Sequence, residues 1–261
     1  MRVARVIVSI FFSAILPIRL SGQNSPPAVD IAQPVVTRDA QALSLLAQCS
    51  ASMGASSTVP DIYAEGKITP TNPNNPSATI VLKSKGTDRV RNEINYPSGQ
   101  QVYVLNNGRG FSSISGQRKN LAAHAVSYFR PEHLNAYACS IDLARTNVSV
   151  SYVGLENLAP ASVHHVVFHA ASSDPLDQLI SEFHVYLDTK TLRVIKTSNW
   201  AFAPDAIENR SLWETYYDNY QTVAGVLVPM HISHFMAGSR LDDWNFTSVF
   251  SDVPVADGEF N

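Results

Sequence analysis

The sequence predicts a mainly β protein, an antiparallel sheet preceded by one N-terminal helix. Short segments rich in β-branched and aromatic residues follow one another from residue 62 to residue 250, and turn-forming residues separate them. Few helical segments alternate with these strands, which favours antiparallel pairing over βαβ units. The 261-residue chain is 45% hydrophobic and 16% charged, so it holds enough apolar material for a substantial core.

The N-terminal helix is expected over residues 39–53. Asp39 is a suitable N-cap, and Leu43, Leu46 and Cys49 recur with the spacing of one helix face. Gly54 ends the pattern, because glycine readily adopts the left-handed conformation that closes a helix.

The strands are predicted from hydrophobic runs bounded by Gly, Pro, Asn and Asp. Residues 119–138 break this rhythm and are expected to form one or two short helices interrupted at Pro131. A tight turn at Ala224-Gly225 is expected to join the last long hairpin. The expected strands are 62–69, 78–84, 89–96, 101–105, 110–115, 147–155, 162–170, 180–188, 192–202, 211–222, 226–235 and 243–250.

The N-terminus has the features of a secretory signal peptide. Arg2 and Arg5 precede an apolar run over residues 6–18, and small residues follow it. We expect a cleavable signal peptide over 1–22, a flexible leader over 23–38 and a single domain over 39–261. A retained anchor is the alternative. After cleavage of the signal peptide, the mature chain would carry no transmembrane span and would be periplasmic or secreted.

The two cysteines, Cys49 and Cys139, have two interpretations. In an oxidising compartment an even pair suggests one disulfide, which is the first interpretation for an exported chain. The alternative is two buried thiols at unrelated positions, because separation along the sequence says nothing about distance in space.

No motif in the sequence points to catalysis. The chain has no G-x-S-x-G elbow, no P-loop and no G-x-G-x-x-G turn. His164 and His165 point to opposite faces of a strand, as do His231 and His234, so neither pair is arranged to hold a metal. We therefore expect no catalytic residues, metal or cofactor, and the net charge of −3 makes nucleic acid an improbable partner.

Four cations gather near one predicted hairpin: Lys83, Lys85, Arg89 and Arg91. They could form the rim of a pocket that receives an anionic headgroup. The alternative is a solvated hairpin face whose charges protect a sheet edge from unwanted pairing.

Several strands carry apolar residues on both faces. In the strand 180–188, Phe183, Val185 and Leu187 point one way, while His184 and Tyr186 point the other. A sheet that faces water on one side would alternate more cleanly. Either the protein has a thick core, or one face lines a cavity.

The order of several segments resembles a known family. The helix "DAQALSLLAQCSASMG" leads to "VLKSKGTDRVRNEI", "VYVLNNGRGF" and "EFHVYLDTKTLRVIKT", and "YYDNYQTVAGVLVPMHI" comes before the closing "NFTSVFSDVPVADGEF". This order is similar to the LolA/LolB-like superfamily of periplasmic lipoprotein carriers, which includes the lipid-binding N-terminal domain of RseB. The closing Val-x-x-Asp-x-Pro-x-x-x-x-x-Phe pattern is the most specific part. The two cysteines and a long insertion at 119–145 depart from the family, so lipoprotein trafficking does not follow from the resemblance.

The resemblance implies a half-open antiparallel β-barrel with the N-terminal helix and short helices packed on its concave side. Its concave apolar face would bind a hydrophobic small molecule or acyl chain, which makes a non-enzymatic binding or carrier protein the first expectation. The alternative is an interaction or sensor module that uses the same sheet to bind an envelope protein. The expected lining is Ile80, Leu82, Val102, Val104, Phe183, Val185 and Leu187.

Overall fold

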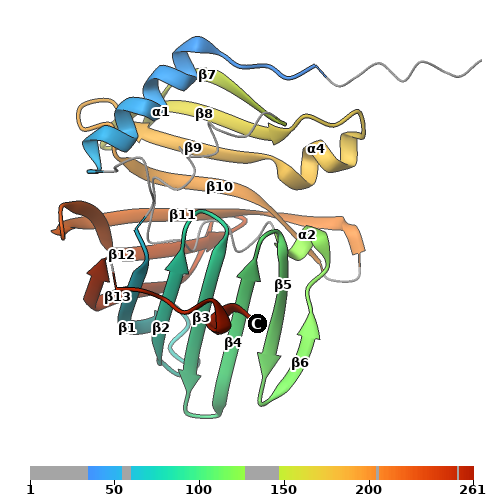
Figure 1. Cartoon of the computed structure of the whole chain (residues 1–261), viewed down its shortest axis with the longest axis vertical. Helices are drawn as coiled ribbons and strands as arrows, with labels where there is room; N and C mark the ends of the chain where they lie inside the picture. The colour runs from blue at the N-terminus through green and yellow to red at the C-terminus, as the bar shows by residue number, and fades with distance from the viewer. Residues whose placement is uncertain (1–34, 55–59, 127–146, 204–205, 252) are drawn as a thin grey trace, which may run out of the picture. The chain divides into compact units, whose positions relative to one another are not determined.

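The computed structural model shows one long antiparallel sheet with few helices (Figure 1). It describes residues 35–54, 60–126, 147–203, 206–251 and 253–261. The helices are α1 (Ala40–Ser52), α2 (Ala123–Val126), α4 (Pro175–Ser181) and the 3-10 helix η3 (Asp257–Phe260). The strands are β1 (Ile62–Pro70), β2 (Ala78–Lys85), β3 (Arg89–Tyr96), β4 (Gly99–Asn106), β5 (Arg109–Ile114), β6 (Gln117–Asn120), β7 (Val148–Leu158), β8 (Ala161–Ala170), β9 (Phe183–Asp188), β10 (Val194–Ala203), β11 (Ala206–Val223), β12 (Val226–Met236) and β13 (Ser239–Ser251).

The sheet consists of two sequential runs of strands joined by a single pairing. β1 to β6 are neighbours in chain order, and so are β7 to β13. β1 pairs with β13, and this seam joins the two runs. Among the described strands β6 and β7 therefore form the two edges, with residues 37–39 hydrogen-bonded to β7 at Val150, and the sheet stays open rather than closing into a barrel. The mainly β class with an N-terminal helix is confirmed.

Helix α1 packs on one face of the sheet, which we call the inner face. The Asp39 side chain caps the helix by accepting a hydrogen bond of 2.8 Å from the Ala42 amide. Leu46, Cys49 and Met53 are fully buried, and they share one apolar cluster with residues of β1, β2, β8, β9, β12 and β13. The predicted helix and its N-cap are therefore confirmed, and α1 covers the core.

The end of α1 is held against the turn between β11 and β12. Gly54 has a φ of +77°, and the Leu227 amide donates a hydrogen bond of 2.9 Å to the Met53 carbonyl. A Cβ atom at Gly54 would lie 2.0 Å from the carbonyl oxygen of Gly225. Only glycine satisfies both the left-handed backbone and this close approach.

Replacing Gly54 with alanine should therefore lower the free energy of unfolding by at least about 2 kcal/mol, because left-handed strain adds to a backbone clash. Urea unfolding measures the loss. Gly86→Ala is the matched control, since Gly86 has a φ of +63° and nothing lies within 4 Å of its Cβ position. Equal losses at the two positions would mean that the contact with the β11–β12 turn contributes nothing.

The β11–β12 hairpin turns where the sequence predicts. Val223 pairs with Val226, and the two turn residues, Ala224 and Gly225, have φ angles of 49° and 86°. Pro229 pairs with Tyr220 of β11, while the pairing of β12 with β13 begins only at His231. The missing amide hydrogen of Pro229 thus interrupts no bond to β13.

Two segments differ from the prediction. The residues from Pro175 to Ser181 form α4, because Asp174 caps them and Pro175 occupies the first turn, so the strand predicted over 180–188 starts only at Phe183. Residues 117–120 form the edge strand β6, where helix was predicted from residue 119 onward. Helix α2 covers residues 123–126, and the remainder of the predicted helical segment lies outside the described residues.

The part of the chain that the structure describes contains no helix that is long and apolar enough to span a membrane. The predicted signal peptide, its cleavage position and most of the leader lie outside the described residues.

Candidate functional site: a pocket at the β6 edge

The predicted ligand-lining residues lie on two different faces of the sheet. Ile80, Leu82, Phe183, Val185 and Leu187 all belong to the apolar cluster beneath α1, on the inner face. Val102 and Val104 belong to a separate cluster with Val255 and Phe260. The register explains this, because Val104 pairs with Arg91 and Arg91 pairs with Lys83, the neighbour of Leu82. The seven residues therefore do not form one lining.

Helix α1 packs against the predicted lining residues that lie on the inner face. Leu82, Val185 and Leu187 are fully buried, and Phe183 is 7% exposed. Leu46 and Met53 of α1 belong to the same cluster and are also fully buried. Side chains of the protein itself therefore cover all five predicted lining residues of the inner face, Ile80 included.

The four predicted rim cations bind the C-terminal segment of the chain, residues 253–261. Lys83 contacts Glu259 at 2.9 Å, and Arg89 contacts Asp257 at 2.7 Å. Lys85 and Arg91 reach the same two carboxylates and also donate to the carbonyl oxygens of Val255 and Glu259. The cations thus hold the C-terminal segment against the outer face, the face opposite α1.

These ion pairs alter the titration of both carboxyl groups. The hydrogen bond from Lys85, together with its charge and that of Arg89, lowers the pKa of Asp257. The hydrogen bond from Lys83 lowers the pKa of Glu259. Both side chains remain accessible to solvent, so the attraction is screened, and its effect is mainly to set the position of the segment.

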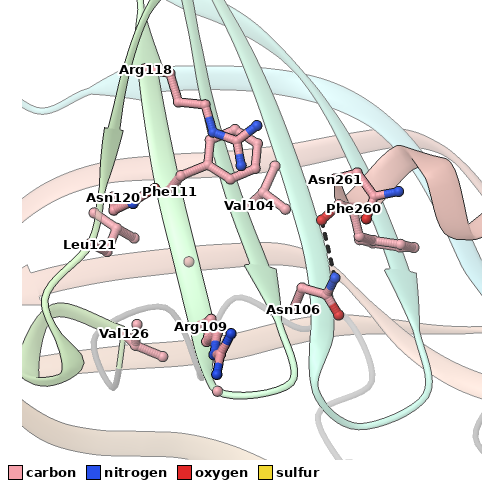
Figure 2. A pocket seen from close by; sticks show the side chains of 12 residues that line it. Val104, Asn106, Arg109, Phe111, Arg118, Asn120, Leu121, Val126, Phe260 and Asn261 are labelled. Atoms are coloured by element: carbon pink, nitrogen blue, oxygen red, sulfur yellow. Dashed lines mark hydrogen bonds between the residues drawn. The ribbon is translucent and has the colours of Figure 1, made fainter.

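The C-terminal segment forms one wall of a pocket at the β6 edge of the sheet (Figure 2). The pocket has a volume of about 500 Å³. Its apolar surface comes from Val104, Phe111, Leu121, Val126 and Phe260. Polar groups come from Asn106, Arg109, Arg118, Asn120 and Asn261, and the backbone of Gly108 and Gly110 completes the lining.

Two arginines border this pocket from neighbouring strands. The Arg118 guanidinium lies over the ring of Phe111, 3.6 Å from the ring centroid. Arg109 lies on the same pocket, at the start of β5. Within the described part of the chain neither arginine forms an ion pair, so both charges are available to an anionic group.

Phe260 is held in its place by contacts on several sides. It is 2% exposed, and it packs with Val102, Val104 and Phe111. The Asn106 side chain donates a hydrogen bond of 3.2 Å to its carbonyl oxygen, drawn as the dashed line in Figure 2. The shape of the pocket therefore depends on the docking of the C-terminal segment.

Of the predicted lining residues Val104 lies in this pocket, and the sequence prediction missed the others that line it. Phe260 is the last residue of the closing pattern, which suggested family resemblance and nothing about a site. Arg109 lies in "NNGRG", which was interpreted as a turn, and Arg118 comes just before the segment 119–138 that was predicted to be helical. Only the sheet register shows that these residues meet.

Cys49 is a free, fully buried thiol in the structure. Its Sγ lies 3.9 Å from the Met53 Sδ, and burial raises the pKa of the thiol to about 12. Cys139 lies outside the described residues, so the disulfide remains a prediction.

The histidine clusters are bound to acidic and aromatic side chains. His231 lies between Asp218 at 2.8 Å and Asp243 at 3.0 Å, and His234 contacts Asp242 at 2.7 Å. Among the described residues no group of three or more His, Cys, Asp or Glu side chains is arranged to hold a metal ion.

Comparison with known proteins identifies the fold. No family model and no curated protein matches the chain. Among solved structures, a putative outer membrane lipoprotein-sorting protein domain from Vibrio parahaemolyticus matches with a TM-score of 0.58 at 11% identity, over 85% of this chain and 96% of that one. A LolA superfamily protein from Nitrosomonas europaea matches with a TM-score of 0.54 at 11% identity, over 84% and 97%.

A DUF1329 family protein from Desulfovibrio piger also matches, with a TM-score of 0.54 at 10% identity, over 85% of this chain and 96% of that one. Identities this low carry information on the fold alone. The pairing order, the N-terminal helix and these matches lead to one conclusion: this chain has the fold of the LolA/LolB-like superfamily.

Proposed function

We propose that this protein is an exported, non-enzymatic binding or carrier protein for a lipid-like ligand with an acyl chain and an anionic group. The ligand binds in the pocket at the β6 edge. The observation that carries the proposal is the combination of an apolar floor with two arginines that have no ion-pair partner among the described residues.

The size and lining of the pocket suit such a ligand. Pockets for small molecules usually have volumes of roughly 300–1,000 Å³, with a mostly apolar lining and a few polar groups. The pocket here, at about 500 Å³, lies within that range. Phe111 and Phe260 would contact the acyl chain, and Arg109 and Arg118 would contact a carboxylate.

This proposal moves the ligand away from the position that the family resemblance implies. The resemblance places it on the face that α1 covers, where Val185 and Leu187 are fully buried against the protein itself. An acyl chain could occupy that face only by displacing α1. The β6 pocket requires no such change.

A titration with a fluorescent fatty-acid probe tests the proposal. The wild-type protein should bind the probe, and Arg118→Glu should weaken binding about tenfold or more, because a charge-assisted hydrogen bond is replaced by repulsion. Lys119→Glu makes the same change of charge at the next residue. Lys119 pairs with Ser112 and so points to the other face of the sheet, and its replacement should leave binding unchanged.

Two results would contradict the proposal. If the wild type binds no fatty-acid probe and organic extracts of the purified protein contain no lipid, the carrier function is wrong and only the fold remains. If Arg118→Glu and Lys119→Glu weaken binding equally, the probe responds to net charge and does not occupy this pocket.

A further inference from the structure

A chain of four titratable side chains crosses the outer face of β7, β8 and β9. Glu156 of β7 contacts His165 Nδ1 of β8 at 2.5 Å. His165 Nε2 lies 2.8 Å from His184 Nδ1 of β9, and His184 Nε2 lies 3.0 Å from Glu182. The Trp200 indole N–H of β10 donates to the same Glu182 oxygen at 3.1 Å.

The number of protons on this chain is restricted by its geometry. The two rings have four nitrogens, and the three contacts of the chain need three N–H donors. Two neutral imidazoles supply only two hydrogens, which leaves a ring nitrogen lone pair facing either a carboxylate or the lone pair of the other ring. Two imidazolium rings supply four hydrogens, which places two N–H groups against each other across 2.8 Å. One excess proton on the pair satisfies every contact.

We propose that Glu156, His165, His184 and Glu182 form a pH-sensitive latch that holds one excess proton near neutral pH and opens when it takes a second. In the closed state His165 is neutral with its hydrogen on Nδ1, where it donates to Glu156. His184 is the imidazolium and donates to both His165 and Glu182. The second proton comes from solvent, binds His165 Nε2 and removes the acceptor of the bond between the rings.

The surroundings of His165 agree with this assignment. The ring is stacked on Tyr186, with ring centroids 4.4 Å apart, and the residue is 7% exposed. Burial lowers the pKa of His165, and the charges of His184 and Lys196 lower it further, although Glu156 acts in the opposite direction. The remaining charged and titratable groups here pair with one another or with neutral partners: Lys196 with Glu214, Tyr186 with Ser198, Asp177 of α4 with Ser172, and His169 with the Ala170 carbonyl.

The sign of the pH effect follows from the lowered pKa. The unfolded chain protonates His165 near its ordinary value of 6.5, while the folded chain resists that proton. The stability that depends on His165 staying neutral is therefore present above this pH and is lost progressively as the pH falls below it. Opening would release the side-chain ties that join β7 to β8 and β8 to β9, while the hairpins of β1 to β6 would be unaffected.

Nitrogen NMR of histidine-labelled protein between about pH 8 and pH 4.5 tests the latch, in the range where histidine side chains change charge. His165 should appear as the neutral Nδ1–H tautomer while His184 is charged, and the two rings should titrate in separate steps. Hydrogen exchange of β7 and β9 amides, referenced to β2 and β3, should accelerate across the second step. Simultaneous titration of the two rings in the wild type would overturn the proposal without any variant.

His184→Gln removes the neighbouring charge and should move the titration of His165 to higher pH. His164→Gln is the matched control, because His164 lies next to His165 but points to the inner face and contacts Tyr152 at 3.1 Å. An unchanged His165 titration in folded His184→Gln protein, or the same shift in the control, would show that the two rings do not share a proton.

Discussion

Replacing Phe260 with alanine should lower the free energy of unfolding by roughly 3–5 kcal/mol, the usual range for a buried phenylalanine. Phe260 is 2% exposed and forms the centre of the outer-face cluster with Val102, Val104 and Phe111. Its loss would remove apolar contacts and leave a cavity that the β strands cannot close. Chemical denaturation with two optical probes gives the value.

Phe250→Ala is the control for this prediction. Phe250 is 51% exposed and contacts Tyr63 with ring centroids 6.2 Å apart, so its removal should cost less than about 1 kcal/mol. Phe260→Ala should also abolish binding of the fatty-acid probe, because Phe260 lines the pocket. A variant as stable as the wild type would mean that the C-terminal segment is not docked on the sheet in solution.

Leu46→Ala should destabilise the protein by roughly 2–5 kcal/mol, the range for core leucines. Leu46 is fully buried at the centre of α1, and its cluster reaches both runs of the sheet. Alanine has the higher helix propensity, so the loss comes from packing and not from the helix itself. Thermal and urea unfolding both measure it.

Leu176→Ala provides the same substitution on a helix where little packing is lost. Leu176 lies in α4 and is 40% exposed, so we expect a change within about 0.5 kcal/mol. If Leu46→Ala cost no more than this control, α1 would not be part of the core, and the inner face would be open to a ligand after all.

Most of the fold could be predicted from local patterns. Alternation of apolar residues located twelve of the strands, and the Asp39 cap with the Leu46 and Cys49 spacing located α1. Strand β6 was missed because its residues, Gln117 to Asn120, are polar and all exposed, so no alternation exists to detect. Helix α4 was missed although Asp174-Pro175 is a start signal, and its last two residues were assigned to the strand predicted over 180–188.

The site could not be predicted, because it depends on sheet register. The predicted alternation of side chains within each strand is correct. Which residues of two neighbouring strands share a face, however, depends on the turn that joins the strands. Tyr96 pairs with Gly99 across a two-residue turn, so even-numbered residues of β3 face odd-numbered residues of β4. Leu82 therefore shares a face with Tyr103, and Val104 lies on the other side.

The ion pairs of the four basic residues could not be predicted either, because they join residues that are far apart in the sequence. The four basic residues were found in the sequence, but their partners, Asp257 and Glu259, lie at the other end of the chain. No local pattern connects an acidic residue of an irregular segment to a hairpin so far away. These ion pairs can be predicted only once it is known that strand β1 pairs with strand β13.

The β1–β13 seam has a consequence for the order in which the chain folds. Ile62 pairs with Ser251, so the two runs of strands cannot join until nearly all of the chain described here has been synthesised. Until then β1 presents an unpaired edge, and such edges promote aggregation of partly folded chains. Contacts between residues so distant in sequence also slow folding. The nascent protein is thus most in need of a chaperone in the interval before its last strand becomes available.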